Sequence, residues 1–181
     1  KPDAVFLCNP NNPTGKTIAP SLLEKILAFC ASSGIRLFVD ECFLDLSDSG
    51  ESLKAFLAHN PNLFILKAFT KSYGMAGIRL GYCMSSDSEL LEKMSQSTQP
   101  WNVSSIAQAA GVAALQEKAF LQKTKDLIAV ERQWLKRELE ELGFRVCPSS
   151  VNYLLFQAPT CLHTKLRAKK IAIRNCDNYV G

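Results

Sequence analysis

The sequence predicts an α/β fold: part of a large domain with a mostly parallel sheet between helices, followed by most of a small α+β domain. Two observations lead to this prediction. In the first part of the chain, almost continuously hydrophobic runs alternate with amphipathic segments, as expected of parallel strands buried on both faces. After residue 143, short strand-like runs surround one short helical segment. With 181 residues, 47% of them apolar, the chain can bury a sizeable core.

The first part of the chain is expected to contain three strands and one long amphipathic helix. Turn signals separate these elements: an Asn-Pro-rich cluster at 9–15 follows the first strand, Pro20 begins the helix, and Gly34 ends it. In chain order, the predicted elements are a strand at 3–8, a helix at 20–33, and strands at 35–39 and 62–66.

The second part of the chain is expected to be mainly helical before it returns to short strands. A break at 100–102 precedes a periodic stretch from 104 to 142, which is long enough to bridge two subdomains and is interrupted near Lys118. The predicted elements are helices at 87–94, 104–142 and 162–168, and strands at 144–147, 153–156 and 171–174.

Composition argues against several classes of protein. The net charge of +4 is spread along the chain, which does not favour nucleic-acid binding, and no apolar run approaches the ~20 residues of a membrane span. Two isolated histidines and seven cysteines without a C-x-x-C pair favour neither a metal site nor a Ser-His-Asp hydrolase. The odd cysteine number favours reduced thiols. We therefore expect a cytoplasmic protein without metal, membrane or nucleic-acid partners.

Polar side chains follow the carboxyl ends of the three predicted strands. Asn12 lies after the first strand, Asp40 directly after the second and Lys71 shortly after the third, with Arg79 following along the chain. Because ligands of parallel α/β sheets bind at this edge, we expect these side chains to converge there. Lysine, arginine and aspartate suit a ligand with an electrophilic carbonyl, a phosphate and a basic ring nitrogen. Pyridoxal phosphate carries all three groups.

Six sequence blocks resemble the fold-type I pyridoxal-phosphate enzymes of the class I/II aminotransferase family, in the family's order and spacing. They are NPNNPTG (9–15), VDECF (39–43), TKSYGMAGIRLGY (70–82), QPWNVSSIAQAA (99–110), VNYLLF (151–156) and IRNCDNY (173–179). The fourth and sixth blocks are most similar to threonine-phosphate decarboxylases of cobalamin biosynthesis, whose near relatives are histidinol-phosphate aminotransferases. The resemblance implies a large pyridoxal-phosphate-binding domain at 1–118 and a truncated small domain at 119–181.

The resemblance assigns a role to each residue of the strand-end group. It makes Lys71 the Schiff-base lysine and places Asp40 beside the pyridine nitrogen of the cofactor. Arg79 would bind the cofactor phosphate through its planar fork of donors, and Asn12 the phenolic oxygen of the ring. Each residue also has an ordinary structural explanation: a solvated lysine, a turn or cap aspartate, a surface ion pair, and an asparagine that favours a turn.

Further positions match or depart from the family pattern. Arg174 matches a residue that contacts the anionic group of the substrate, although an arginine ending a strand can equally form a structural ion pair. Phe43 stands where many relatives have a tyrosine, which leans towards the decarboxylase branch. Ala68 stands where many have serine or threonine, so a phosphate contact is lost or passes to Thr70.

The resemblance implies a pyridoxal-phosphate-dependent enzyme that acts on a phosphorylated amino acid or amino alcohol. A threonine-phosphate decarboxylase-like activity is the first hypothesis, a transaminase of the histidinol-phosphate type is the alternative, and a non-enzymatic cofactor-binding regulator is disfavoured by the intact lysine, aspartate and arginine. The resemblance further implies a homodimer. Because these enzymes are much longer, we also expect 181 residues to be the length of a C-terminal-half fragment.

Overall fold

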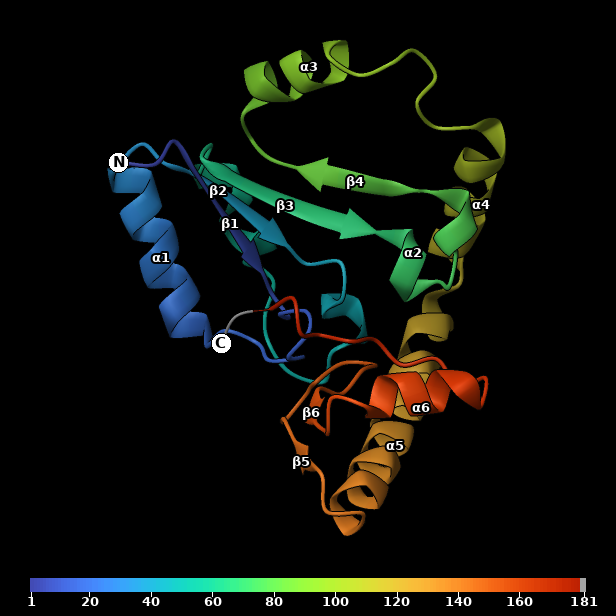
Figure 1. The fold of residues 1–181 in the computed structure, drawn as a ribbon. Helices are drawn as coiled ribbons and strands as arrows, with labels where there is room; N and C mark the ends of the chain where they lie inside the picture. The colour runs from blue at the N-terminus through green and yellow to red at the C-terminus, as the bar shows by residue number, and fades with distance from the viewer. Residues whose placement is uncertain (180–181) are drawn as a thin grey trace.

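The computed structural model describes residues 1–179 and contains a four-stranded sheet surrounded by helices (Figure 1). The strands lie in the order β1-β2-β3-β4; the first three run parallel, and β4 runs antiparallel to β3. A mostly parallel sheet within an α/β fold is therefore confirmed. The strands are β1 (Ala4–Cys8), β2 (Arg36–Asp40), β3 (Leu63–Ala68) and β4 (Gly81–Met84).

One face of this sheet packs against helix α1 (Pro20–Ser32) and the 3₁₀ helix η2 (Leu53–His59). Apolar side chains at alternate strand positions point to this face because successive residues of a strand face opposite ways. They form one hydrophobic cluster with the inner stripe of α1. Its buried members are Leu23, Leu27, Cys30, Ile35, Leu37, Val39, Leu53, Leu63 and Ile65.

The opposite face carries a row of three phenylalanines, one from each parallel strand. The ring of Phe6 stacks on Phe38 with 4.6 Å between centroids, and Phe38 stacks on Phe64 at 4.7 Å. Phe64 is fully buried, whereas Phe6 on β1 stays 70% exposed. The sequence predicts strands buried on both faces, and within residues 1–179 this face is open at β1.

The segment after β3 differs from the sequence prediction at one point. Strand β4 was not predicted, because the glycine-rich run before it carries no apolar alternation. It forms because β3 continues two residues beyond the predicted end, which gives Gly81 and Tyr82 backbone partners in Ala68 and Lys67. Short helices lie between β3 and β4: α2 (Phe69–Ser72) and the 3₁₀ helix η3 (Ala76–Ile78).

The predicted helices of the second part are present with small shifts at their ends. Side-chain caps begin two of them: Asp87 accepts a hydrogen bond from the Leu90 amide, and Ser104 accepts one from the Ala107 amide. The long predicted stretch breaks at Glu117, one residue from the expected interruption. The helices are α3 (Ser88–Gln96), α4 (Ser105–Gln116) and α5 (Lys118–Glu141). None of the helices within residues 1–179 combines the length and apolar character that crossing a membrane requires.

The last part of the chain contains less strand than predicted. Of the strand predicted at 153–156, only Phe156 is in a strand, and the segment 171–174 forms none. The carbonyl of Leu155 accepts a hydrogen bond from the Cys147 amide at 2.8 Å, whereas the Tyr153 hydroxyl donates to the carbonyl of Asn11 and Ile171 is 51% exposed. The observed elements are β5 (Arg145–Val146), β6 (Phe156–Gln157) and α6 (Leu162–Ala168).

Polar contacts join this last part to the loops of the main sheet. The hydroxyl of Ser47 donates to that of Ser150 at 2.7 Å, and Ser150 donates to the carbonyl of Gly15 at 3.1 Å. Arg132 of α5 forms an ion pair with Asp48. In Figure 1 the C-terminal segment, coloured red, runs back towards the loop that follows β1. Residues far apart in sequence therefore meet at the carboxyl ends of the strands.

Candidate functional site

The carboxyl ends of β1 and β2 place a half-buried carboxylate beside a tight turn. Asp40 is the last residue of β2 and lies opposite Cys8 in the parallel register. One of its carboxylate oxygens, Oδ1, accepts a hydrogen bond from the amide of Cys42 at 3.0 Å. This bond turns the side chain back over the strand end and fixes its orientation.

The turn after β1 is held by its own asparagines. Asn9 is fully buried, and its side-chain oxygen accepts a hydrogen bond from the amide of Ile18 at 2.8 Å. The side-chain oxygen of Asn11 accepts one from the Thr14 hydroxyl at 2.8 Å. These contacts leave Asn12 half-buried at the tip of the turn, where its side chain can reach a neighbour.

Arg174 is that neighbour. Its Nη1 donates to the side-chain oxygen of Asn12 at 3.3 Å, and its Nη2 donates to the Tyr179 hydroxyl at 2.6 Å. The guanidinium carbon also lies 5.2 Å from the centroid of the Tyr179 ring. The structure thus brings together Asn12 and Arg174, two residues separated by most of the chain.

Lys71 lies on the four-residue helix α2, which directly follows β3. Its side chain is exposed, and its Nζ lies 5.4 Å from the centroid of the Phe43 ring. Phe43 follows Asp40 in the loop after β2, so the amine and the carboxylate stand at the ends of neighbouring strands. Thr70, the preceding residue, is half-buried on the same helical turn.

Arg79 follows the 3₁₀ helix η3, in the loop between α2 and β4. It is exposed, adopts a left-handed φ of 60°, and donates from Nη1 to the carbonyl of Ala76 at 3.1 Å. The amide of Phe69 donates to the carbonyl of Leu80 at 3.1 Å, which keeps this loop beside α2. Within residues 1–179, no hydrogen bond or ion pair joins Arg79 to Asp40 or Lys71.

Tyr153 connects the two sides and was missed as a site residue by the sequence reasoning. Its ring packs edge-on against Phe43 with 5.0 Å between centroids, and its hydroxyl donates to the carbonyl of Asn11 at 3.0 Å. Burial raises the pKa of Tyr153, and the nearby Cys8 thiol and Asp40 carboxylate add to this effect. Its phenol therefore stays protonated and acts as a hydrogen-bond donor.

The thiol next to Asp40 is held in its neutral form. Burial raises the pKa of Cys42 to about 12, and the hydrogen bond and charge of Asp40 add to this effect. Burial likewise raises the pKa of Cys8. Because the thiols and the phenol around Asp40 are neutral at pH 7, none of them is available as a thiolate nucleophile.

An ion cluster of Glu41, Lys67 and Asp45 joins β3 to the segment after β2; Glu41 is fully buried and Lys67 is 9% exposed, whereas the Asp45 side chain is 37% exposed. The Lys67 amine lies 3.3 Å from Glu41 Oε2 and 2.8 Å from Asp45 Oδ1. Burial alone would lower the pKa of Lys67, but the hydrogen bond and charge of Asp45, with those of Glu41, raise it above its ordinary value. The signal in the sequence was a lysine inside an otherwise apolar strand, which requires buried anionic partners.

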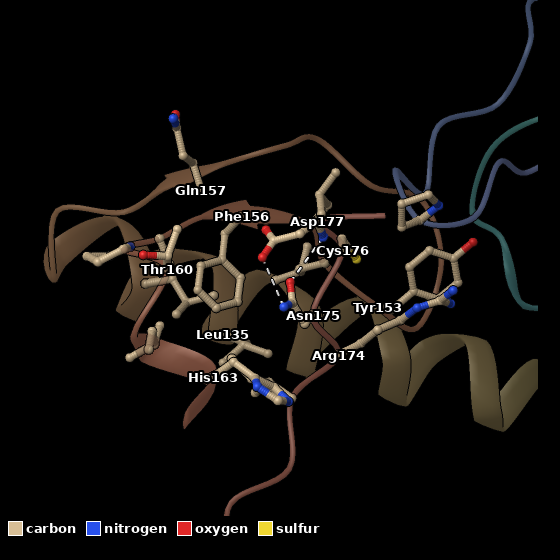
Figure 2. A pocket seen from close by; sticks show the side chains of 18 of the residues that line it. Leu135, Tyr153, Phe156, Gln157, Thr160, His163, Arg174, Asn175, Cys176 and Asp177 are labelled. Atoms are coloured by element: carbon tan, nitrogen blue, oxygen red, sulfur yellow. Dashed lines mark hydrogen bonds between the residues drawn. The ribbon is translucent and has the colours of Figure 1, made fainter. Parts of the chain in front are cut away.

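A cavity of about 600 Å³ opens on the far side of Asn12, between the C-terminal segment and helices α5 and α6 (Figure 2). Tyr153 and Arg174 lie together at one side of it, and His163 lies below Leu135 (Figure 2). Its remaining wall is largely apolar. Of the predicted site residues, Asn12 and Arg174 line this cavity, whereas Asp40, Thr70, Lys71 and Arg79 do not.

Comparison with known proteins identifies relatives over nearly the whole chain. The chain is 36% identical to the threonine-phosphate decarboxylase of Salmonella typhimurium, an alignment that covers 99% of this chain and 50% of that protein. The structure of a histidinol-phosphate aminotransferase from Clostridium acetobutylicum superposes with a TM-score of 0.92 at 28% identity, over 99% of this chain and 56% of the other.

A further related structure is that of an enzyme in complex with pyridoxal-5'-phosphate. The histidinol-phosphate aminotransferase from Sinorhizobium meliloti in complex with pyridoxal-5'-phosphate superposes with a TM-score of 0.83 at 26% identity, over 95% of this chain and 48% of the other. This chain therefore spans about half the length of the proteins it matches. Residues 1–178 match the family described as "Aminotransferase class I and II", and the chain belongs to that family.

Proposed function

We propose that this chain carries part of the site of a pyridoxal-phosphate-dependent enzyme that acts on a phosphorylated amino acid or amino alcohol, with decarboxylation of L-threonine O-3-phosphate as its reaction. The observation that carries the proposal is the position of Lys71, whose amine lies over the Phe43 ring in the loop that begins at Asp40. A relative at 36% identity is a threonine-phosphate decarboxylase, which supports the choice of reaction.

The strand-end residues Asn12, Asp40, Lys71 and Arg79 fit the chemistry of pyridoxal phosphate. The Asp40 carboxylate suits the protonated ring nitrogen, the Lys71 amine suits the aldehyde, and the Arg79 guanidinium suits the phosphate. The Asn12 side-chain oxygen already accepts from Arg174, so its amide nitrogen is left to donate to a phenolic oxygen. When bound, the cofactor supplies an electron sink for a bond that breaks at the amino-bearing carbon of the substrate.

The chain's own residues supply positioning and proton transfer. Lys71 holds a proton on Nζ and delivers it to the substrate carbon, a role that suits an exposed amine at the end of a long side chain. Arg174 binds the anionic group of the substrate through its planar fork of donors. Because Arg174 also holds Asn12, binding of the anion and orientation of the Asn12 amide depend on the same guanidinium.

Transamination of histidinol phosphate is the second candidate. The superposition with the Clostridium enzyme at a TM-score of 0.92 favours it. The same amine serves both reactions, because the outcome depends on which bond at the amino-bearing carbon is held perpendicular to the plane of the cofactor. The two reactions differ in their need for a keto acid.

Turnover assays separate the candidates. The full-length protein is incubated with pyridoxal phosphate and either L-threonine O-3-phosphate alone or histidinol phosphate with 2-oxoglutarate, and release of CO2 or formation of glutamate is measured. Release of CO2 without a keto acid supports the decarboxylase. Turnover only with 2-oxoglutarate would contradict it and support the transaminase, and binding of the cofactor without either turnover would support a non-enzymatic role.

The assignment of Lys71 has its own test. Pyridoxal phosphate added to the protein should produce a visible absorbance, and reduction with borohydride followed by peptide mass spectrometry should locate one pyridoxyl group on Lys71. The Lys71→Ala variant should lose both signals, because no other amine lies over the Phe43 ring within the described residues. Lys16→Ala, which removes an exposed lysine in the turn after β1, is the matched control. A label on another lysine would refute the assignment.

A further inference from the structure

In the sequence, the residues of the ion cluster, Glu41, Asp45 and Lys67, lie between Asp40 and Lys71, the two groups that the proposed function needs most. Glu41 directly follows Asp40, and Lys67 lies near the end of β3, shortly before Lys71. The cluster is not required to complete the hydrophobic core, whose members lie on the α1 face of the sheet. A charged cluster in such a place needs a reason beyond packing, because apolar residues of similar volume are often at least as stable.

Glu41 is held by hydrogen bonds to its side chain and to its backbone amide. Its side chain is fully buried; Oε2 accepts from the Ser52 hydroxyl at 2.7 Å, and Oε1 accepts from the Leu53 amide at 3.1 Å. Its own amide donates to the carbonyl of Leu66 at 3.0 Å. Hydrogen bonds to its backbone amide and to both carboxylate oxygens thus hold Glu41 in place. Because Glu41 directly follows Asp40, these bonds also restrain the backbone of Asp40.

Lys67 connects Glu41, at the end of β2, to the next strand, β3. Its side chain is only 9% exposed, and its amine contacts Glu41 and Asp45 together. A cation between two carboxylates holds both at defined distances, whereas a single ion pair leaves one partner free to rotate. Lys67 therefore links β3 to both the end of β2 and the 3₁₀ helix η1 (Leu44–Leu46), which contains Asp45.

Asp45 completes the path to the helix of Lys71. While its Oδ1 contacts Lys67, its Oδ2 accepts a hydrogen bond from the Ser72 hydroxyl at 3.3 Å. Ser72 is 2% exposed and directly follows Lys71 on α2, a helix too short to be held by its own backbone bonds. The path from Asp40 to Lys71 is therefore continuous, through Glu41, Lys67, Asp45 and Ser72.

We infer that the ion cluster, with Ser72, is a positioning device that sets the distance and orientation between the Asp40 carboxylate and the Lys71 amine. This inference rests on the proposed function, because it concerns the geometry of the same site. Its residues touch neither cofactor nor substrate. They act through the two residues that do, as supporting groups of a preorganised site commonly act.

Two mild substitutions test the inference without opening the core. Ser72→Ala removes one hydroxyl and leaves every charge in place, and Asp45→Asn keeps the shape of the side chain while weakening its hold on Lys67. The measurements are the dissociation constant of pyridoxal phosphate and the pH midpoint of the visible absorbance of the bound cofactor. We expect each variant to weaken binding by about tenfold and to shift the midpoint, Asp45→Asn by more.

Matched controls remove the same groups elsewhere. Ser97→Ala removes an exposed hydroxyl that donates to the Lys93 carbonyl at 2.7 Å, and Asp126→Asn changes an exposed carboxylate that accepts from Gln122. Both should keep wild-type affinity and midpoint. Lys67→Met should lose binding of the cofactor, and Lys67→Arg, which keeps the cation, should restore most of it. If Lys67→Met does not fold, Ser72→Ala and Asp45→Asn still decide the question.

The outcomes distinguish this inference from the proposed function. If the wild-type protein binds pyridoxal phosphate through Lys71 but Ser72→Ala and Asp45→Asn keep its affinity and pH midpoint, the cluster is only structural and the inference is wrong. If both variants merely unfold at lower temperature, with unchanged affinity and midpoint for the folded protein, the result is the same. If the wild-type protein gives no visible absorbance with the cofactor, the proposed function fails, and the inference fails with it.

Discussion

The sheet and helix α5 use apolar residues in opposite ways. On the α1 face of the sheet, Leu37, Val39 and Leu63 are completely buried. Helix α5 contains no buried residue, and its Leu127 and Val130 are 61% and 66% exposed. Both regions form the type of element that their apolar spacing predicts. The comparison shows that periodicity determines the type of element, while burial depends on which other elements reach its apolar side.

The two regions should therefore differ most when a leucine is truncated. Leu37→Ala removes a side chain from the centre of the cluster between α1 and the sheet and leaves a cavity among close-packed neighbours. We expect a loss of about 2–5 kcal/mol in the free energy of unfolding. Urea denaturation followed by circular dichroism measures it.

The matched change in α5 is Leu127→Ala. The side chain is 61% exposed and alanine has the higher helix propensity, so the free energy of unfolding should change by less than about 0.5 kcal/mol. If Leu127→Ala lowered the free energy of unfolding as much as Leu37→Ala, Leu127 of α5 would be packed against another surface in solution. The expected difference between the sheet and α5 would then be wrong.

An effect smaller than that of Leu37→Ala is expected where the turn after β1 meets the C-terminal part of the chain. Gly15 has a φ of +72°, and a Cβ added there would lie 2.1 Å from the Ser149 hydroxyl oxygen and 2.6 Å from its Cβ. Gly15→Ala therefore combines backbone strain with a clash against the segment that joins the C-terminal part to the turn after β1. We expect a loss of about 2–3 kcal/mol, measured by the same denaturation experiment.

Gly74→Ala isolates the backbone contribution. Gly74 has a similar φ of +65°, but a Cβ there would meet nothing within 4 Å. Its loss should be limited to about 1 kcal/mol, the strain of the left-handed conformation alone. Equal losses at both glycines would mean that Ser149 moves aside freely and that the contact between the regions is loose.

The sequence predicted the parts of the fold that depend on local signals. Helix α1 begins at Pro20 as expected, and the break at Glu117 lies one residue from the predicted interruption. It did not predict β4, nor the loss of the strand at 171–174, because both depend on whether a neighbouring strand is present. Pairing of strands is a tertiary property that apolar spacing alone does not contain.

The candidate site divides in the same way. The positions of Asp40 and Lys71 at the ends of neighbouring strands followed from the strand pattern, and their roles stay predictions. The contact of Tyr153 with Phe43 and the path through Asp45 to Ser72 could not be predicted, because each joins residues whose spacing in the chain carries no periodic signal. Side-chain networks of this kind arise only once the backbone is placed.

The smallest effect concerns the alkylation rate of Cys42, the half-buried thiol beside Asp40, compared with that of an exposed cysteine. Burial raises the pKa of Cys42 from 9.0 to about 12, while Cys161 is exposed. Native protein treated with iodoacetamide at about pH 8 should therefore react at Cys161 well before Cys42, since the thiolate is the nucleophile. In unfolded protein the two cysteines should react at similar rates.

The same shift makes stability depend on alkaline pH. The unfolded chain releases the Cys42 proton near pH 9, whereas the folded chain keeps it to about pH 12, so the folded state binds more protons in this range. Stability should therefore fall as the pH rises above about 9. Cys42→Ser, whose hydroxyl does not ionise there, should flatten this part of the pH profile.

Because burial is the largest cause of the shift in the pKa of Cys42, Asp40→Asn should speed alkylation of Cys42 only slightly. A large acceleration would show instead that the carboxylate, rather than burial, keeps this thiol neutral.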